Sequence, residues 1–210
     1  MHPITAANLL SMRRYTCYLL IGAPGSGKGT QGKVLGTIPG YFHMDCGKVF
    51  RALDLRTAVG RRFAEFSSKG LLVPDDLTME LWQTTINAQV QAMRFRPDHD
   101  ALVLDGIPRN QNQAKLMETL IDMQHSFHLS CPDREELILR LRKRALHDNR
   151  LDDANESVIR KRLETYECET RPILEYYRNK LTVIDATKRP IEVAKQIINT
   201  IAMKHYLAAA

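Results

Sequence analysis

Five short apolar stretches alternate with helical patterns along this chain, and this alternation limits the possible folds more than any other feature. The stretches read "TCYLLIG" (16–22), "YFHM" (41–44), "ALVLDG" (101–106), "SFHLSC" (126–131) and "LTVIDA" (181–186). Each has the length and apolar content of a buried strand. Between them lie helical patterns, such as 190–207, which opens with a proline and repeats apolar residues at Val193, Ile197 and Ile201. We predict an α/β fold with a five-stranded parallel sheet and helices on both faces.

Parallel sheets bind their ligands at the carboxyl ends of the strands, so the turns after these stretches are expected to carry the chemistry. The chain has 210 residues, which is enough to bury one full core without disulfides. Its 30 Lys and Arg residues exceed its 24 Asp and Glu residues. This excess suits a partner rich in phosphate, whether a nucleotide, a nucleic acid or an anionic surface.

The cysteines and the apolar runs indicate the compartment. Four cysteines, at 17, 46, 131 and 168, lie far apart and form no Cys-x-x-Cys pair, so they indicate neither a zinc site nor a disulfide scaffold. No apolar run approaches the roughly 20 residues that span a bilayer. We therefore expect a cytoplasmic protein that does not bind a membrane. The first fifteen residues contain no acid and two arginines, which is only weakly typical of an organelle transit segment.

A glycine-rich segment, "GAPGSGKGTQ" (22–31), follows the first predicted strand and has the spacing of a phosphate-binding loop. Its glycines let backbone N–H groups approach phosphate oxygens, and the helix that follows offers its positive end. Lys28 adds a cation. The usual magnesium-binding Ser or Thr after the lysine is replaced by Gly29, with Thr30 one residue later. Magnesium would therefore need a shifted geometry, or waters and carboxylates from elsewhere.

Seven segments carry a family resemblance, in the order "GAPGSGKGTQ", "CGKVFRA", "GLLVPDDL", "LDGIPRNQNQA", "NRLDD", "IRKRLETY" and "VIDATK". On these motifs the chain resembles the nucleoside monophosphate kinases, and within them the adenylate kinases with a short lid. The resemblance implies a phosphate-loop core with two small mobile lobes. It also implies a monomer that reversibly transfers a phosphoryl group from ATP to AMP, with Mg²⁺, to give two ADP.

The resemblance also implies a division of the chain. Residues 1–14 would be an N-terminal extension, residues 47–76 a monophosphate-binding lobe and residues 145–153 a short lid. The core would consist of 15–46, 77–144 and 154–210. The lid is too short for the longer, sometimes zinc-bearing, lid of other family members, so we expect no structural zinc. Lobes that close would exclude water from the reaction.

Arginines are expected to surround the transferred phosphate, because in-line transfer depends on positioning and charge neutralisation. Arg140 and Arg144 are four apart and share one helix face; in an isolated helix this would more often be a solvated basic face. The resemblance instead makes them catalytic, together with Lys28, Arg109, Arg150 and Arg162. One extra residue precedes "RKRLETY" relative to the commonest short-form pattern, so Arg160 remains an alternative to Arg162.

The resemblance assigns the two nucleotide sites residue by residue. The ATP site would consist of Gly25, Ser26, Gly27, Lys28, Gly29, Thr30, Arg140, Arg144 and Lys188. The AMP site would consist of Cys46, Arg51, Val73, Gly106, Arg109, Gln113, Arg150 and Arg162.

Asp105 ends a predicted strand, and its carboxylate is expected to meet the waters of the magnesium ion. Cys46 and Lys48 depart from the family's Thr-Gly-Asp motif, and Lys48 reverses a charge near those waters.

Gln113 lies where adenylate kinases have the glutamine that reads adenine, whereas Asn110 also occurs in UMP/CMP kinases. A UMP/CMP kinase is therefore an alternative. A nonenzymatic nucleotide-binding module is another, but no aromatic stacking motif accompanies the arginines, so we expect no nucleic acid.

Overall fold

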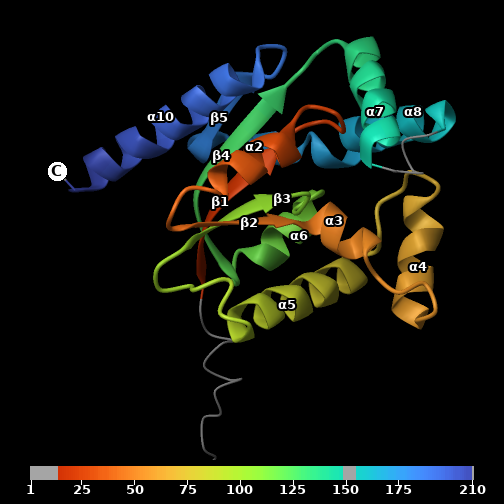
Figure 1. The fold of residues 1–210 in the computed structure, drawn as a ribbon, viewed down its shortest axis with the longest axis horizontal. Helices are drawn as coiled ribbons and strands as arrows, with labels where there is room; N and C mark the ends of the chain where they lie inside the picture. The colour runs from red at the N-terminus through yellow and green to blue at the C-terminus, as the bar shows by residue number, and fades with distance from the viewer. Residues whose placement is uncertain (1–13, 149–154, 210) are drawn as a thin grey trace, which may run out of the picture.

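The structure, a computed structural model, describes residues 14–148 and 155–209 (Figure 1). Its centre is a parallel sheet of five strands in the order β2-β3-β1-β4-β5. The strands are β1 (Tyr15–Ile21), β2 (Tyr41–Asp45), β3 (Ala101–Asp105), β4 (Ile121–Ser130) and β5 (Leu181–Asp185). This arrangement confirms the predicted five-stranded parallel sheet.

One strand begins earlier than the sequence predicts. β4 was expected from residue 126, but it begins at Ile121, where it pairs with Tyr15 at the start of β1. The added segment, "IDMQH", contains polar residues, and an apolar run therefore misses it. The register between the two strands shifts between Cys17 and Tyr18, which marks a bulge in the ladder.

Helices connect the strands and cover both faces of the sheet (Figure 1). The first half of the chain has α2 (Lys28–Leu35), α3 (Cys46–Arg51), α4 (Ala58–Ser67), α5 (Asp75–Gln91) and α6 (Gln111–Met117). The second half has α7 (Arg134–Asp148), α8 (Glu156–Thr165), the π-helix η2 (Tyr166–Thr170), α9 (Ile173–Tyr176), the 3-10 helix η3 (Arg178–Lys180) and α10 (Pro190–Ala209). The fold is thus α/β, with helices on both faces as predicted.

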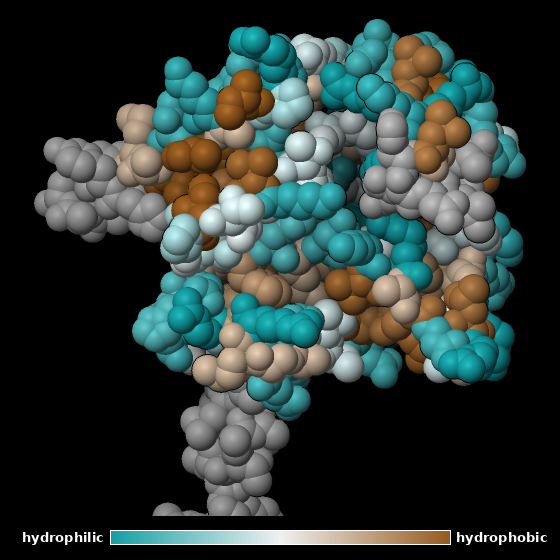
Figure 2. Space-filling model, in the orientation of Figure 1, coloured by the Kyte–Doolittle hydropathy of each residue, from teal (hydrophilic) through white to brown (hydrophobic). Residues whose placement is uncertain are grey.

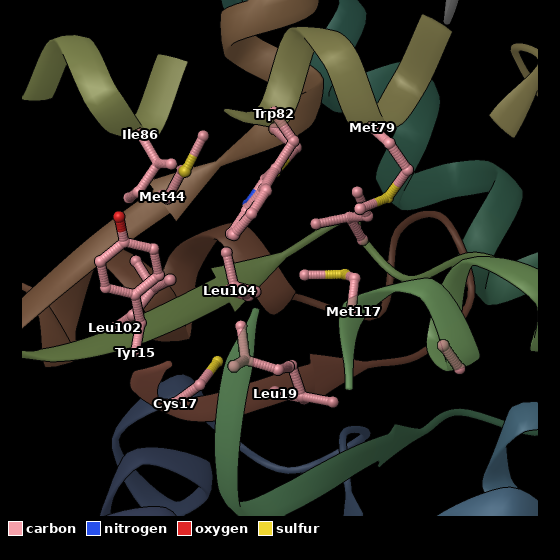
Figure 3. Close-up of a cluster of buried hydrophobic side chains, with 14 of the residues drawn as sticks. Tyr15, Cys17, Leu19, Met44, Met79, Trp82, Ile86, Leu102, Leu104 and Met117 are labelled. Carbon is pink, nitrogen blue, oxygen red and sulfur yellow. The ribbon is translucent and has the colours of Figure 1, made fainter. Parts of the chain in front are cut away.

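Two hydrophobic cores form because successive strand residues point to opposite faces of the sheet. Cys17 and Leu19 of β1 belong to the core under α5 and α6, while Tyr18 and Leu20 belong to the core under α2, α7 and α10. Figure 3 shows the first core, where Trp82 of α5 lies over the sheet. The two cores lie above and below the sheet, and the loops and helix starts that follow the strands lie at its carboxyl edge.

The predicted lobes fall on identifiable parts of the chain. Residues 47–76 include most of α3 and all of α4. The first residues of the predicted lid, 145–148, continue α7, and the lid residues 149–153 lie outside the described residues, as does most of the N-terminal extension. Lid and lobe movements therefore stay predictions. No helix in the described part of the chain is long and apolar enough to cross a membrane.

Candidate active site

The glycine-rich loop joins β1 to α2 and has the backbone of a phosphate-binding turn. Gly25 and Gly27 have φ angles of 86° and 96°, a region that L side chains rarely adopt. A Cβ atom at Gly25 would also lie 2.9 Å from the carbonyl oxygen of Leu137. Ser26 is 2% exposed, and its Oγ atom has no hydrogen-bond partner among the described residues. An unsatisfied hydroxyl in a loop ahead of a helix N-terminus suits an anionic ligand.

Lys28 is the first residue of α2 and bends back over the loop. Its Nζ atom donates hydrogen bonds to the carbonyl oxygens of Gly22, at 2.8 Å, and Ala23, at 3.0 Å. Burial lowers the pKa of Lys28 to about 8, an effect that the nearby Asp105 carboxylate opposes. Among the described residues the ammonium group is therefore hydrogen-bonded to backbone carbonyls only, and a phosphate would offer it a stronger acceptor.

Three predicted arginines come within electrostatic reach of Lys28. The guanidinium groups of Arg109, Arg144 and Arg162 each lower the pKa of Lys28 further, after the larger effects of burial and Asp105. They reach it from the turn after β3, from α7 and from α8. The structure therefore gathers positive charge from three separate segments around the phosphate loop, as transfer between two polyphosphates requires.

The predicted monophosphate side is gathered around two glycines. A Cβ atom on Gly47 would lie 3.1 Å from Nη1 of Arg51, and one on Gly106 would lie 3.3 Å from Nη2 of Arg109. The same position on Gly106 lies 3.9 Å from Cβ of Cys46. Two guanidinium groups therefore approach the place where the backbones of Gly47 and Gly106 meet, which is a suitable cradle for a phosphate.

Arg109 is held by its backbone and by its side chain. Its Nε atom donates to the carbonyl oxygen of Gly106 at 2.8 Å, and its backbone N–H donates to Oε1 of Gln113 at 2.8 Å. The hydroxyl of Thr170 donates to the carbonyl oxygen of Arg109 at 2.7 Å. Among the described residues Arg109 forms no ion pair with a carboxylate, so its charge is available to a ligand.

Gln113 is 1% exposed, and both ends of its amide already have partners. Its Nε2 atom donates to Oδ1 of Asp75 at 2.8 Å, while Oε1 accepts from Arg109. Asn110 and Asn112 also donate to the Asp75 carboxylate, at 2.9 Å and 2.6 Å. Desolvation opposes the three amide hydrogen bonds, but the net effect is a lowered pKa of Asp75. Asp75 therefore fixes the direction in which the Gln113 amide points.

Asp105 is 6% exposed and lies beside a second carboxylate. In the ladder between β2 and β3 it pairs with Asp45, the last residue of its own strand. Burial raises the pKa of Asp105; Lys28 opposes this rise and Asp45 adds to it. The described residues contain no cluster of three or more His, Cys, Asp or Glu that would bind a metal alone. Two carboxylates facing a phosphate loop nevertheless fit Mg²⁺, which keeps several waters and shares its shell with phosphates.

Other predicted residues lie at the edges of this arrangement. Arg140 donates to Glu136 at 2.8 Å and to the carbonyl oxygen of Ala186 at 2.9 Å, so it ties α7 to the segment that carries the exposed Lys188. Thr30 is exposed, and Arg150 lies outside the described residues. Arg160 bonds Glu135 and Glu156, and only Arg162 of the two affects Lys28.

Val73 lines a groove of about 770 Å³ between the end of α4 and the helices α8 and η2. Asp75 and Asn110 line the same groove, so the Asp75 network borders it. Figure 2 shows hydrophobic side chains gathered over α3 and α4, below α7 and α8. Lys48, whose charge reverses the family pattern, is exposed, and its backbone N–H donates to Oδ1 of Asp45 at 2.8 Å.

Sequence reasoning missed three residues of this site: Asp45, Asp75 and Thr170. Asp45 had a usable signal, because it follows an apolar stretch as Asp105 does. Asp75 had a weaker one, as an acid in the first turn of a helix. Thr170 had none, because only the wide turn of the π-helix brings it to Arg109.

Comparison with known proteins agrees with this geometry. A family model described as adenylate kinase matches residues 20–182. An adenylate kinase of Thermobifida fusca is 38% identical over 186 residues, which cover 85% of this chain and 93% of that protein. One of a Cyanothece species is 37% identical, covering 85% of this chain and 91% of its own. One of Mycoplasma pneumoniae is 29% identical, covering 87% and 97%. The chain therefore belongs to the adenylate kinase family and is a phosphotransferase.

Proposed function

We propose that this enzyme transfers the terminal phosphoryl group of Mg²⁺-bound ATP to AMP, reversibly, and so forms two ADP. The observation that carries the proposal is the approach of Arg109, Arg144 and Arg162 to Lys28 at the phosphate loop. A binding site for one nucleotide has no need of cations from so many segments. A site where two phosphate chains meet must offset the charge of both.

Each group has a role that follows from its position. The loop N–H groups and Lys28 would hold the ATP phosphates, while Arg51 and Arg109, beside Gly47 and Gly106, would hold the AMP phosphate. Arg144 and Arg162 would neutralise the charge that develops on the transferred group, and we extend this role to Arg150. No covalent nucleophile is needed, because the AMP phosphate oxygen itself attacks the terminal phosphorus and ADP leaves.

Mg²⁺, when bound, would neutralise part of the charge of the ATP phosphates. Asp105 fits as the holder of its waters, because this carboxylate is buried and lies next to the first turn of α2. We propose no further metal, and no zinc in the short lid.

The preference for AMP would depend on Gln113. Asp75 only accepts hydrogen bonds and the Arg109 N–H only donates, so the Gln113 amide is fixed in one orientation with one N–H and one oxygen lone pair to spare. Adenine offers an amino donor beside a ring acceptor, which matches that pair, whereas uracil and guanine offer the reverse. Since Gln113 is buried in this conformation, the lobe 47–76 would have to move for AMP to reach it.

The proposal includes a monomer in the cytoplasm. One chain supplies every residue named above, and all four cysteines are free thiols, as a reducing compartment allows. Closure of the lobe 47–76 over AMP and of the lid 145–153 over ATP would exclude water, which otherwise competes with AMP for the phosphoryl group.

The test is an assay of the purified protein with Mg-ATP and, separately, AMP, CMP, UMP and GMP. We expect AMP to give the highest kcat/KM. Comparable activity with CMP or UMP would instead support the UMP/CMP kinase alternative. Comparable activity with UMP or GMP would exclude the base preference assigned to Gln113, whereas cytosine has the same amino donor beside a ring acceptor as adenine. A nonenzymatic nucleotide-binding module would form no ADP with any of the four.

A further inference from the structure

Two aspartates end neighbouring strands side by side. Asp45 closes β2, Asp105 closes β3, and the two are directly paired in the parallel register. Parallel strands that pair at their last residues place both side chains at the same edge of the sheet. This edge is the one that meets the phosphate loop, so two negative charges share the place where the nucleotide phosphates are expected.

Both carboxylates face the same residue of the loop. A Cβ atom built on Gly29 would lie 3.5 Å from Oδ2 of Asp105 and 3.9 Å from Oδ2 of Asp45. Gly29 occupies the position at which the usual loop has a magnesium-binding hydroxyl. The missing hydroxyl is therefore matched by two carboxylate oxygens from the sheet, which lie on the side to which a side chain at position 29 would point.

Neither carboxylate forms an ion pair with a cation of the described residues. Among residues 14–148 and 155–209, no ion pair is formed by Asp45 or Asp105, and the Lys28 ammonium is bonded to two loop carbonyls. Asp105 is 6% exposed and accepts no hydrogen bond from the described residues. Asp45 uses Oδ1 to cap α3, through the Lys48 N–H at 2.8 Å, and this leaves Oδ2 directed at Gly29. Two adjacent carboxylates, of which Asp105 is buried and Asp45 is partly buried, repel each other and are stabilised by a cation between or beside them.

We propose that Asp45 is the second carboxylate of the magnesium site, which it forms with Asp105 around the waters of the ion. This inference rests on the proposed Mg²⁺-dependent function and deepens it. The family motif has its acid at position 48, where this chain has an exposed lysine. The acid has moved to the end of β2, three residues earlier, and from there it reaches the same edge of the sheet as Asp105.

The test uses Mn²⁺ as a paramagnetic probe and an ATP analogue with a methylene bridge, which cannot transfer its terminal group. Free Mn²⁺ is measured by electron paramagnetic resonance as the ion is added to the complex of protein and analogue. We expect Asp45→Asn and Asp105→Asn each to weaken Mn²⁺ binding by roughly tenfold or more. Asparagine can still cap α3, so the first variant keeps the local fold.

Asp185→Asn is the matched control. Asp185 also ends a strand and also accepts hydrogen bonds from its own turn, at Thr187, but it lies at the end of β5. The Asp185→Asn variant should bind Mn²⁺ with the same affinity as the unchanged protein. A second measurement, thermal unfolding without metal, should show a higher Tm for Asp45→Asn, because one of two adjacent negative charges is removed.

If Asp45→Asn binds Mn²⁺ within twofold of the unchanged protein while Asp105→Asn does not, Asp45 has no place in the site. If both variants bind Mn²⁺ as tightly as the unchanged protein, the paired site is overturned altogether. Should Asp45→Asn fail to fold, Asp45→Ser keeps a capping oxygen without the charge and is held to the same criterion. Failure of the proposed function is a different result: the unchanged protein would form no ADP from Mg-ATP and AMP.

Discussion

Thr170 and Arg109, sixty-one positions apart, are joined by a 2.7 Å hydrogen bond from the Thr170 hydroxyl to the Arg109 carbonyl oxygen. Thr170 is the last residue of the π-helix η2. Such helices are rare in proteins as a whole, but many of those that occur lie at functional sites. Gln113 accepts from the N–H of the same arginine. Arg109 thus has its backbone held at both polar groups, which leaves its guanidinium in one place beside Gly106.

Arg109→Ala should reduce turnover by roughly 10³ to 10⁵, the effect of removing an arginine that acts on a transferred phosphate. A coupled assay of ADP formation would measure it, with Arg94→Ala as the control, since Arg94 is an exposed arginine after α5. The control should keep full turnover. A loss below about tenfold in Arg109→Ala would remove Arg109 from the mechanism.

Nucleotide affinity should depend on pH through Lys28. Burial lowers the pKa of Lys28 to about 8, and only the protonated amine attracts phosphate. As the pH rises through this value the free protein loses the proton, so the affinity for ADP should fall by roughly tenfold between pH 7 and pH 9. Calorimetric titration at pH 7, 8 and 9 would measure this fall. Lys28→Met should bind more weakly at pH 7 and show little change, and a parallel fall in both proteins would contradict the assignment.

Two glycines of α2 should respond differently to alanine. A Cβ atom on Gly32 would overlap the His43 ring, with Cε1 only 2.7 Å away, so Gly32→Ala should lower the free energy of unfolding by about 1–3 kcal/mol. A Cβ atom on Gly29 would make only ordinary van der Waals contacts, so Gly29→Ala should change the free energy of unfolding by less than about 0.5 kcal/mol. Urea unfolding would compare them. Adding His43→Ala to Gly32→Ala should restore much of the loss, and a loss that persists would show that His43 is not its cause.

Base preference should depend on Asp75. Asparagine at this position both donates and accepts, so Asp75→Asn would remove one of the two groups that orient the Gln113 amide and leave only the Arg109 N–H to disfavour the orientation that matches uracil or guanine. The ratio of kcat/KM for AMP to that for UMP should fall by roughly tenfold, the value of about one hydrogen bond to a charged group. Asp76→Asn is the control, because Asp76 is the exposed neighbour in the same helical turn. An unchanged ratio in Asp75→Asn would disprove the orienting role.

The sheet was predictable from the sequence because its central strands β1 and β3 are covered on both faces and therefore read as continuous apolar runs. The start of β4 was not predictable, because Asp122 and Gln124 are polar and only partly buried, and they interrupt the apolar pattern of the strand. Its pairing with β1 comes from the rest of the sheet, and a local pattern cannot reveal it.

Within the site, the phosphate loop and Arg109 were predictable because each belongs to a short motif with fixed spacing. Asp45 had a local signal at the end of an apolar stretch, but its position beside Asp105 depends on a strand register that the sequence does not reveal. Arg140 and Arg144 share a helix face in the sequence, but the structure ties Arg140 to Glu136 and Ala186, and only Arg144 affects Lys28. Helical spacing alone cannot separate two such arginines.

The central claim, transfer between two nucleotides, is tested most directly by the reverse reaction. Purified protein is mixed with ADP and Mg²⁺ and nothing else, and the products are followed by phosphorus nuclear magnetic resonance. We predict that ATP and AMP appear in equal amounts and that no inorganic phosphate is released. Unchanged ADP, or AMP with inorganic phosphate and no ATP, would contradict the account.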